Sequence, residues 1–216
     1  MAFRNTKVFL SSVAMLLGTT LVPNAHPHVF VQANMEIVIN DMGQFTELRH
    51  VWKFDELFSS TLVFDFDKNG DNKLDKAEIE EITNTIKSSI SEYDFYTAMR
   101  SGKDVINFYE PDKLNAYMEN GEMIMFFSIE PEKPHDFKTA PLRISASDTS
   151  YYVAFEFSEK NITIKENGKG CKTSVTVPDY DSLYADDSLT LSEAYFTNPE
   201  NPELGDEFFS WAEIKC

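Results

Sequence analysis

The sequence of 216 residues predicts an α+β fold, in which a mainly antiparallel sheet carries an EF-hand-like helix–loop–helix and a disulfide-tied C-terminal tail. Three observations support this prediction. Two strand-like runs flank a tight turn near residue 42, a long stretch with apolar residues at three- and four-residue steps ends near residue 100, and several short strand-like runs follow it. Helices packed on one side of a sheet are the usual result of that order.

The composition is that of an ordinary globular domain, with 42% hydrophobic and 13% aromatic residues. The formal net charge is −17, and no cluster of Lys and Arg supplies the basic face that a nucleic-acid-binding protein needs. The same charge disfavours stable docking on anionic lipids. An acidic protein suits metal cations or a basic protein partner, although acidity also simply keeps a protein soluble.

The first 25 residues have the pattern of a secretory signal peptide. Arg4 and Lys7 precede the apolar run VFLSSVAMLLGTTLV, and Ala25 offers a small residue for cleavage. The run is too short for a transmembrane helix, and no later stretch resembles one. We therefore expect a mature protein that begins at His26, is exported and has no stable membrane insertion.

The segments HVFVQANMEIVIND and QFTELRHVWKF alternate in strand style on either side of a Met-Gly turn, and this pattern predicts a hairpin. A turn at this position pairs residues whose numbers sum to about 85. His50 then lies opposite Met35, and His28 lies close to Asp55.

Two helical segments follow, DELFSSTLVFDF and DKAEIEEITNTIKSSISEYDFYTAMR, and they predict a helix–loop–helix insertion at residues 55–100. The pattern then changes after Gly102. Turn signals such as ENG and EPEKP separate the remaining strand candidates, which are DVINFY, KLNAYME, EMIMFFSIE, LRISAS, YYVAFEF, ITIKE and KTSVTV.

The loop between the helical segments, DKNGDNKLDKAE, has the spacing of an EF-hand calcium loop. Its ligand positions 1, 3, 5, 7, 9 and 12 are, in this order, Asp67, Asn69, Asp71, Lys73, Asp75 and Glu78. Lys73 would contribute only its backbone carbonyl. Position 6, usually Gly, is Asn72, a residue that tolerates the left-handed conformation. A solvated acidic turn is the alternative, but oxygen-bearing side chains in register favour calcium.

We expect this calcium to be structural. Sensor EF-hands usually occur in pairs, and the sequence offers no second loop. Extracellular-type sites bind calcium with dissociation constants of about 10⁻⁴ to 10⁻³ M. In a compartment rich in calcium the site would therefore stay filled and hold its two helices together.

Cys171 and Cys216 are the only cysteines, and in an exported protein such a pair predicts a disulfide. The bridge would close a loop of about 45 residues, which contributes about 4 kcal/mol to stability in the chain-entropy model. It would tie an acidic tail, residues 179–216, to the rest of the protein. Free or metal-binding thiols are the alternative.

The four histidines are His26, His28, His50 and His135, and the first two would open the mature chain as His-Pro-His. Pro27 lacks the amide proton that a square-planar amino-terminal copper or nickel site requires. Two kinds of site remain: a brace in which the terminal amine and His26 chelate copper, or a pocket for zinc, nickel or cobalt that His26 and His28 form with other groups. A polar terminus without a ligand is the alternative.

In the predicted hairpin register, the carboxylate of Asp55 can bind the metal or hydrogen-bond to a ligating imidazole. His50 lies further along the strand. The sequence contains no HExxH, no GxSxG and no phosphate-binding loop. We therefore do not expect an enzyme, and a copper-brace oxidase is a remote alternative.

Five stretches occur in the order AHPHVF, RHVWKFDELFS, DKNGDNKLDKAE, EYDFYT and DTSYYVAFEF. Together they resemble the bacterial domain-of-unknown-function family one-thousand-seven, over residues 25–178, with the acidic tail largely outside. Members are similar in having the His-Pro-His start and a single calcium-type loop, often with Gly in place of Asn72. They are sometimes described as periplasmic components of an uncharacterised ABC-type transport system, and their genes often neighbour nickel/cobalt transporter genes.

The resemblance implies a periplasmic metal-binding accessory protein of a transition-metal transport system, with an inner-membrane metal transporter as partner and a structural calcium. Its predicted site for zinc, nickel, cobalt or copper comprises His26, His28, His50, Asp55 and Asp148. The alternative function is a calcium-stabilised periplasmic protein-interaction module with no transition-metal site. We expect a signal peptide at 1–25, a family domain at 26–178 and an acidic tail at 179–216.

Overall fold

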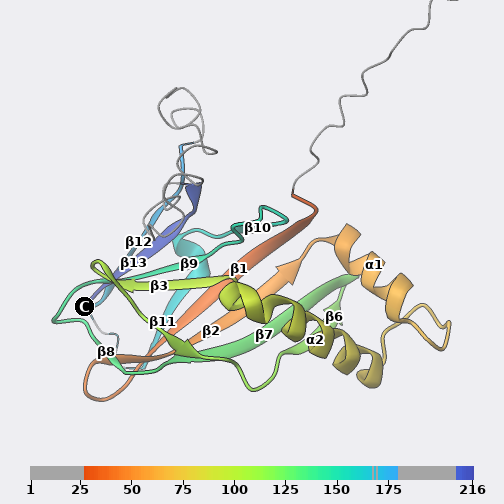
Figure 1. Ribbon diagram of the computed structural model, residues 1–216, viewed down its shortest axis with the longest axis horizontal. Helices are drawn as coiled ribbons and strands as arrows, with labels where there is room; N and C mark the ends of the chain where they lie inside the picture. The colour runs from red at the N-terminus through yellow and green to blue at the C-terminus, as the bar shows by residue number, and fades with distance from the viewer. Residues whose placement is uncertain (1–26, 167, 169, 180–207) are drawn as a thin grey trace, which may run out of the picture.

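The computed structural model describes residues 27–166, 168, 170–179 and 208–216 (Figure 1). The predicted signal peptide and His26 lie outside the described residues. The described chain is a mixed α+β protein made mostly of strands, with two α-helices and mainly antiparallel sheets, as the sequence predicts. None of its described helices is long and apolar enough to cross a membrane.

The helices and strands follow one another in a long hairpin, a helix pair and a series of shorter strands. In chain order they are β1 (Val29–Ile39), β2 (Gln44–Phe54), α1 (Glu56–Phe66), α2 (Lys76–Ile90), the 3₁₀ segment η1 (Ser91–Tyr96), β3 (Thr97–Ser101), β4 (Asp104–Val105), β5 (Phe108–Tyr109), β6 (Asn115–Glu119), β7 (Glu122–Pro131), β8 (His135–Asp136), β9 (Leu142–Ala146), β10 (Val153–Glu156), the 3₁₀ segment η2 (Glu159–Asn161), β11 (Ile162–Glu166), β12 (Lys172–Thr176) and β13 (Trp211–Lys215).

The hairpin of β1 and β2 has the predicted register. Met35 pairs with His50, so paired residue numbers sum to 85 along most of the ladder. Asn40 closes the turn, because its side-chain Oδ1 accepts hydrogen bonds from the backbone N–H of Met42 and of Gln44, each at 3.0 Å. Alternation along both strands buries one face of the hairpin and exposes the other.

The described strands form two separate sheets. The first has the order β10-β1-β2-β7-β5, with β11 also on β1, β6 on β7 and β8 on β2. The second has the order β12-β13-β9-β3-β4. The chain enters the second sheet at β3 and β4, comes back to it at β9, and then returns to the free edge of β1, where β10 and β11 pair with β1 in parallel. The sheets are therefore mainly, not wholly, antiparallel.

One core joins the sheets and the helices. In Figure 1 the helices lie near β6 and β7, and the second sheet lies toward the opposite side of the picture. The Oγ of Ser59 on α1 accepts a hydrogen bond of 2.9 Å from the backbone N–H of Met123 on β7, which fixes α1 to the first sheet. Buried side chains from every layer form the core, among them Trp52, Ile82, Phe95, Met99, Met125 and Ile144.

The last described residues are part of the fold, whereas the sequence predicts an acidic tail there. β13 lies between β12 and β9 in the second sheet, with Trp211, Ala212 and Ile214 buried. The predicted disulfide is confirmed, and it joins Cys171, just before β12, to Cys216, just after β13. Residues 180–207 of the predicted tail lie outside the described residues.

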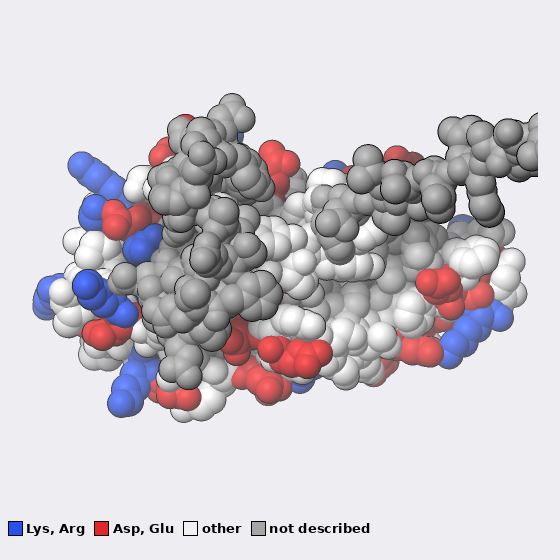
Figure 2. Space-filling model, turned by 45° about the horizontal axis from the view of Figure 1, so that its top comes forward, with Lys and Arg blue, Asp and Glu red and all other residues white. Residues whose placement is uncertain are grey.

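The described surface mixes the two signs of charge. On the face shown in Figure 2, Lys and Arg side chains lie mainly toward the two ends of the molecule and are interspersed with acidic side chains. On the first sheet, Arg49 forms ion pairs with Glu36 and Glu47 at 2.8 and 2.9 Å, and Lys53 pairs with Glu122 at 2.6 Å. Exposed pairs of this kind contribute little to stability, about 0–1 kcal/mol each.

Candidate functional site

Three segments distant in sequence meet where β1 begins. The backbone N–H groups of His28 and Val29 both donate to the carbonyl oxygen of Tyr152, at 2.9 and 3.2 Å. The backbone N–H of Ser147 donates to the carbonyl oxygen of Tyr96 in η1, at 2.9 Å. These bonds bring together the site that we call the β1 end, which comprises His28, Tyr93, Tyr96, Asp148 and Tyr152.

His28 is exposed at this site, as its position before the first strand predicts. Its imidazole lies against the ring of Tyr152, with 5.0 Å between the ring centroids and a tilt of 36°. Tyr152 is itself 48% exposed. The pair therefore presents an accessible imidazole and a phenol directly after the segment that contains His26.

Asp148 shapes the turn that presents Tyr152. Its carboxylate is 2% exposed and accepts hydrogen bonds from the backbone N–H of Ser150 at 2.8 Å, the hydroxyl of Ser150 at 2.7 Å and the backbone N–H of Val153 at 2.9 Å. A buried carboxylate needs such donors, because burial without them is costly. Asp148 thus holds the chain in place between β9 and β10.

The segment η1 carries unusual backbone strain. Asp94, Phe95 and Tyr96 all have positive φ, at 48°, 50° and 51°. The left-handed conformation costs a non-glycine residue about 1–2 kcal/mol, and three in succession persist only where the surroundings hold them. Phe95 is buried to 1% exposure and provides one such anchor. Strain of this kind often marks functional sites.

The strained segment delivers the Tyr96 ring to the β1 end. The ring lies 5.7 Å from that of Tyr93 and 5.5 Å from that of Phe155, measured between centroids. Burial raises the pKa of the Tyr96 phenol to about 12, with further contributions from the charges of Asp148, Tyr93 and Tyr152. Near neutral pH the Tyr96 hydroxyl therefore keeps its proton and can donate a hydrogen bond.

Asp55 lies at the same end of the sheet, as the predicted register requires. Its Oδ2 accepts a hydrogen bond of 2.8 Å from the backbone N–H of Phe30, and its Oδ1 accepts one of 2.9 Å from the backbone N–H of Phe58. The second bond caps the N-terminus of α1. Asp55 therefore fixes the start of β1 to the start of α1.

His50 lies in the core, away from the β1 end. It is fully buried, and its Nδ1 accepts a hydrogen bond of 3.2 Å from Nε1–H of Trp52. Because the indole can only donate, the proton of His50 is on Nε2, which lies 3.1 Å from Oγ1 of Thr97. The Thr97 hydroxyl in turn donates to the carbonyl oxygen of Phe95 at 3.0 Å. Both ring nitrogens are thus engaged with protein groups.

His50 and His28 lie far apart along the hairpin. Met35 is opposite His50, and seven residues of extended chain lead back from Met35 to His28. At about 3.3 Å per residue, this separation is about 23 Å. One ion cannot bridge it, so the structure does not bring His50 into a site with His28.

Of the predicted transition-metal ligands, the structure places His28 and Asp148 in the β1 end, and Asp55 lies beside it, bound to the backbone of Phe30 on β1. Among the described residues, no three His, Cys, Asp or Glu side chains are arranged to hold an ion. His26 lies outside the described residues. Asp55 and Asp148 are instead engaged with backbone N–H groups, so their observed part is to hold the strand and the turn that carry His28 and Tyr152.

Sequence reasoning missed the tyrosines of this site. Tyr93 and Tyr96 belong to the stretch EYDFYT, and Tyr152 belongs to DTSYYVAFEF. Both stretches carry the family resemblance, yet the predicted metal site includes only Asp148 from them. Both stretches occur in the same series of family motifs as AHPHVF. This shared occurrence is the signal from which the tyrosines could have been predicted to lie near His28.

The predicted calcium loop links α1 to α2. The carboxylate of Asp67 turns into the loop, where it accepts hydrogen bonds of 2.7 Å from the backbone N–H of Gly70 and of Asn72. Asn72 has φ of 60°, the left-handed conformation predicted for position 6. Glu78 is 4% exposed and accepts hydrogen bonds from the backbone N–H of Lys68 and of Asp75, both at 2.8 Å.

The carboxylates at the first and last predicted ligand positions, Asp67 and Glu78, both accept backbone N–H groups of the loop in the described structure. The remaining predicted ligands also lie in the loop: Asn69 and Asp71 accept backbone N–H bonds from residues two further on, and Lys73 offers its carbonyl. Asp75 caps α2 through a capping box with Glu78. Asp75 and Glu78 thus start the helix.

Comparison with known proteins assigns the chain to a family. The family described as "Protein of unknown function (DUF1007)" matches residues 11–216. The chain belongs to this family. The match reaches residue 216, so it includes the segment after Pro178 that the resemblance left largely outside.

A curated relative is named as an uncharacterized 15.5 kDa protein in the trpE 3' region of Spirochaeta aurantia. It is 24% identical over 112 residues, which are 50% of this chain and 79% of the relative. Neither description names an activity. A proposal about the chemistry of the site therefore rests on the residues of the site.

Proposed function

We propose that this member of the family is an exported, periplasmic metal-binding accessory protein of a transition-metal transport system, with a structural calcium ion. The β1 end carries the proposal. There an exposed imidazole follows directly on the segment that contains His26 and lies against an exposed phenol. Two carboxylates accept backbone N–H groups and fix the strand and the turn that carry these side chains. The disulfide supports export, because such bridges persist in oxidising compartments.

Each residue has a distinct part in this proposal. His26 and His28 supply nitrogen ligands, which suit zinc, nickel, cobalt and copper. Asp55 and Asp148 orient the strand and turn through their backbone hydrogen bonds. Cleavage after Ala25 would leave His26 beside the new terminal amine, so the metal would be held at the end of the mature chain. An inner-membrane metal transporter would receive or deliver it.

Metal titration of the mature protein, prepared without a His tag, tests this proposal. We expect the wild-type protein to bind at least one of Zn²⁺, Ni²⁺, Co²⁺ and Cu²⁺ with a stoichiometry near one. The variant His26→Ala/His28→Ala should bind that ion at least about 100-fold more weakly, a loss of about 3 kcal/mol, because it lacks both imidazoles. Isothermal titration calorimetry measures both affinities.

A matched control is His135→Ala. His135 lies on β8, where its Nε2 donates to the carbonyl oxygen of Ala140 at 3.0 Å, and it takes no part in the proposed site. Its replacement should leave metal affinity unchanged. If the wild-type protein and the double variant bind all four ions equally poorly, the transition-metal function is excluded.

For the loop Asp67–Glu78 we propose an EF-hand-type calcium site that stabilises the pair α1 and α2. Calcium would replace the backbone N–H groups as the partner of the Asp67 and Glu78 carboxylates. Adding about 5 mM Ca²⁺ should raise the free energy of unfolding by about 1–2 kcal/mol, given an affinity in the extracellular range. Thermal melting with and without chelator measures this gain, at about 2–4 °C per kcal/mol.

The variant Glu78→Gln should lose the calcium response, because it removes the bidentate ligand at position 12. Glu81→Gln makes the same charge change one turn further along α2, where Glu81 pairs with Lys68 outside the ligand positions. It should keep the response. Equal melting temperatures of the wild-type protein with calcium and with chelator would contradict the proposed site.

The alternative, a calcium-stabilised interaction module with no transition-metal site, is favoured by one observation. Large apolar side chains are exposed on the outer face of the first sheet, including Val51, Tyr117 and Phe126. Sequencing the mature N-terminus tests the copper-brace oxidase alternative, which is discarded if the chain does not begin at His26.

A further inference from the structure

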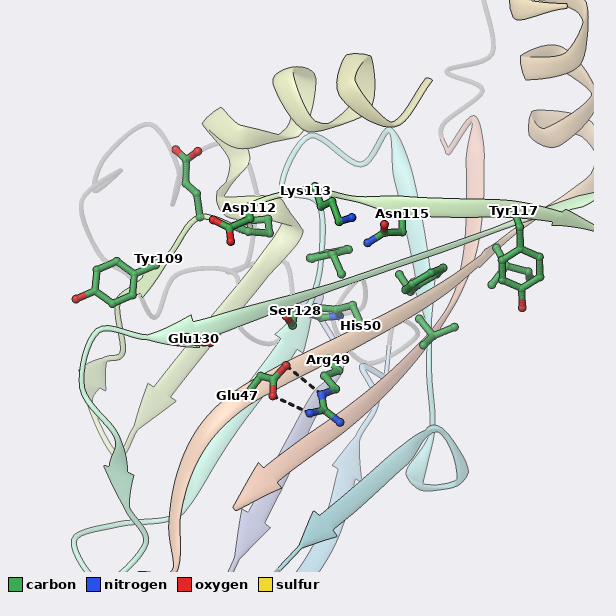
Figure 3. Close-up of a pocket in the computed structure, with 16 residues that line it drawn as sticks. Glu47, Arg49, His50, Tyr109, Asp112, Lys113, Asn115, Tyr117, Ser128 and Glu130 are labelled. Atoms are coloured by element: carbon green, nitrogen blue, oxygen red, sulfur yellow. Dashed lines mark hydrogen bonds and ion pairs between the residues drawn. The ribbon is translucent and has the colours of Figure 1, made fainter. Parts of the chain in front are cut away.

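The outer face of the first sheet contains a hollow of about 680 Å³, remote from the β1 end (Figure 3). β2, β5, β6 and β7 form its floor and sides, and the segment Glu110–Leu114 forms one wall. Pro111 and Leu114 in this wall are buried, and Nζ of Lys87 on α2 donates to the carbonyl oxygen of Asp112 at 2.7 Å. The wall is therefore a fixed part of the fold.

A break in the edge of the sheet creates the hollow. β7 pairs with β6 from Glu122 to Phe126 and with β5 at Glu130 and Pro131. Between these pairings the wall leaves the sheet, and residues 127–129 have strand partners on the β2 side only, among the described residues. The four-residue step from Phe126 to Glu130 gives the hollow a length of about 13 Å.

Apolar side chains are exposed along the hollow. Tyr109 is 60% exposed, Tyr117 45%, Phe126 41% and Val51 40%. In Figure 3, Tyr109 and Tyr117 lie at opposite ends, and Lys113 and Asn115 lie between them. Tyr117 and Phe126 form a ring pair with 6.3 Å between centroids. Neighbouring exposed aromatic side chains of this kind mark binding surfaces more often than ordinary surface.

Negatively charged side chains outnumber positively charged ones around the hollow. Its lining includes the carboxylates of Glu47, Glu110, Asp112 and Glu130 and the cations of Arg49 and Lys113. Arg49 is already paired with Glu36 and Glu47, at 2.8 and 2.9 Å. The wall and the end near Tyr109 therefore carry an excess of negative charge. Exposed rings also attract cations through their faces.

We propose that this hollow binds an extended, basic segment of a partner protein, about four or five residues long, with apolar side chains alternating with Lys or Arg. Charge complementarity selects the basic partner, and the length follows from the 13 Å span, at about 3.3 Å per residue. Apolar side chains of the segment contact Tyr117, Phe126 and Val51. Its cations lie beside Glu110, Asp112 and Glu130. The site uses neither His28 nor the calcium loop.

Two fluorescein-labelled peptides of about seven residues test the proposal: one alternates lysine with valine, and the other alternates glutamate with valine. We expect fluorescence anisotropy to show binding of the basic peptide, with the acidic peptide at least about tenfold weaker. The double variant Tyr117→Ala/Phe126→Ala should lose at least about tenfold in affinity for the basic peptide. Glu110→Gln/Asp112→Asn should weaken it less and flatten its salt dependence.

Phe64→Ala is the matched control, because Phe64 is 87% exposed on α1 and lies outside the hollow. It should bind the basic peptide as the wild-type protein does. The proposal is overturned if the basic peptide does not bind, if both peptides bind equally, or if the Tyr117/Phe126 variant binds normally. It is also overturned if that variant abolishes a concentration-dependent dimer, which would identify a second copy as the occupant. Metal affinity should be unchanged in all hollow variants, so failure here leaves the transition-metal proposal standing.

Discussion

Acidification from about pH 7 to about pH 4.5 is expected to lower the free energy of unfolding by about 3 kcal/mol through His50 alone. Burial lowers the pKa of His50 from 6.5 to about 3. Between those values the unfolded chain binds a proton that the folded chain does not. The stabilisation is therefore complete above pH 6.5 and is lost progressively as the pH falls toward 3.

The hydrogen bonds explain why the folded protein resists this proton. Protonated His50 would carry hydrogens on both ring nitrogens, and Nε1–H of Trp52 would then face another donor. The ring also lies against Phe127, with 4.9 Å between centroids and no charged group in the hydrogen-bond chain to compensate. The folded protein therefore takes up this proton only at a pH well below 6.5.

Urea unfolding at the two pH values measures the loss, with His50→Gln as the decisive variant. The glutamine amide can accept from Trp52 and donate to Thr97, but it does not titrate. Its pH dependence should be smaller by about 3 kcal/mol. His135→Gln serves as a comparison at a second histidine whose pKa burial also lowers. If the ring of His50 titrates near pH 6.5 in NMR spectra of the wild-type protein, the prediction is wrong.

Loss of the disulfide is expected to cost about 4 kcal/mol of stability. The bridge closes a loop with a sequence separation of 45 residues, and the chain-entropy model assigns such a loop about that value. The structure adds a reason for a large effect. β13 lies between β12 and β9, so loosening it also exposes Trp211 and Ile214.

Urea unfolding of the wild-type protein with and without a reductant measures this loss, and Cys171→Ser/Cys216→Ser should reproduce it. The reductant should have no further effect on that variant, which makes the variant its own control. A decrease below about 1 kcal/mol would show that strand packing alone holds β13.

The local parts of the fold were predictable. A Met-Gly turn between two alternating runs leaves one natural register, so the pairing of Met35 with His50 followed directly. The helix pair followed from apolar spacing, but the second helix was predicted too long: it ends at Ile90, and η1 and β3 occupy the rest of the predicted helical segment. The left-handed Asn72 followed from the position of Gly in calcium loops. Each of these depends on residues that are close in sequence.

The non-local parts could not be derived in the same way. The return of β10 and β11 to β1 in parallel depends on pairings more than 100 residues apart, which no local pattern encodes. β13 is a run of only five residues at the end of an acidic segment. Its burial becomes evident only when β9 and β12 lie on either side of it.

The candidate site likewise has a part that the sequence could predict and a part that it could not. His50 alternates with Leu48 and Trp52 on the buried face of β2, and that alternation could have identified it as a core residue. The convergence of His28, Tyr96 and Tyr152 was not accessible, because η1 depends on three successive left-handed residues that are not glycine. No propensity rule predicts such a run.

The central claim is that transition metal binds at the N-terminal histidines. NMR of the imidazole rings during zinc titration of the mature, tag-free protein tests it most directly, because the chain has only four histidines and each ring is followed individually. We predict that the rings of His26 and His28 shift together and saturate near one equivalent, while those of His50 and His135 do not move. Four rings that neither shift nor broaden at an excess of Zn²⁺, Ni²⁺, Co²⁺ or Cu²⁺, each added in turn, would contradict the claim.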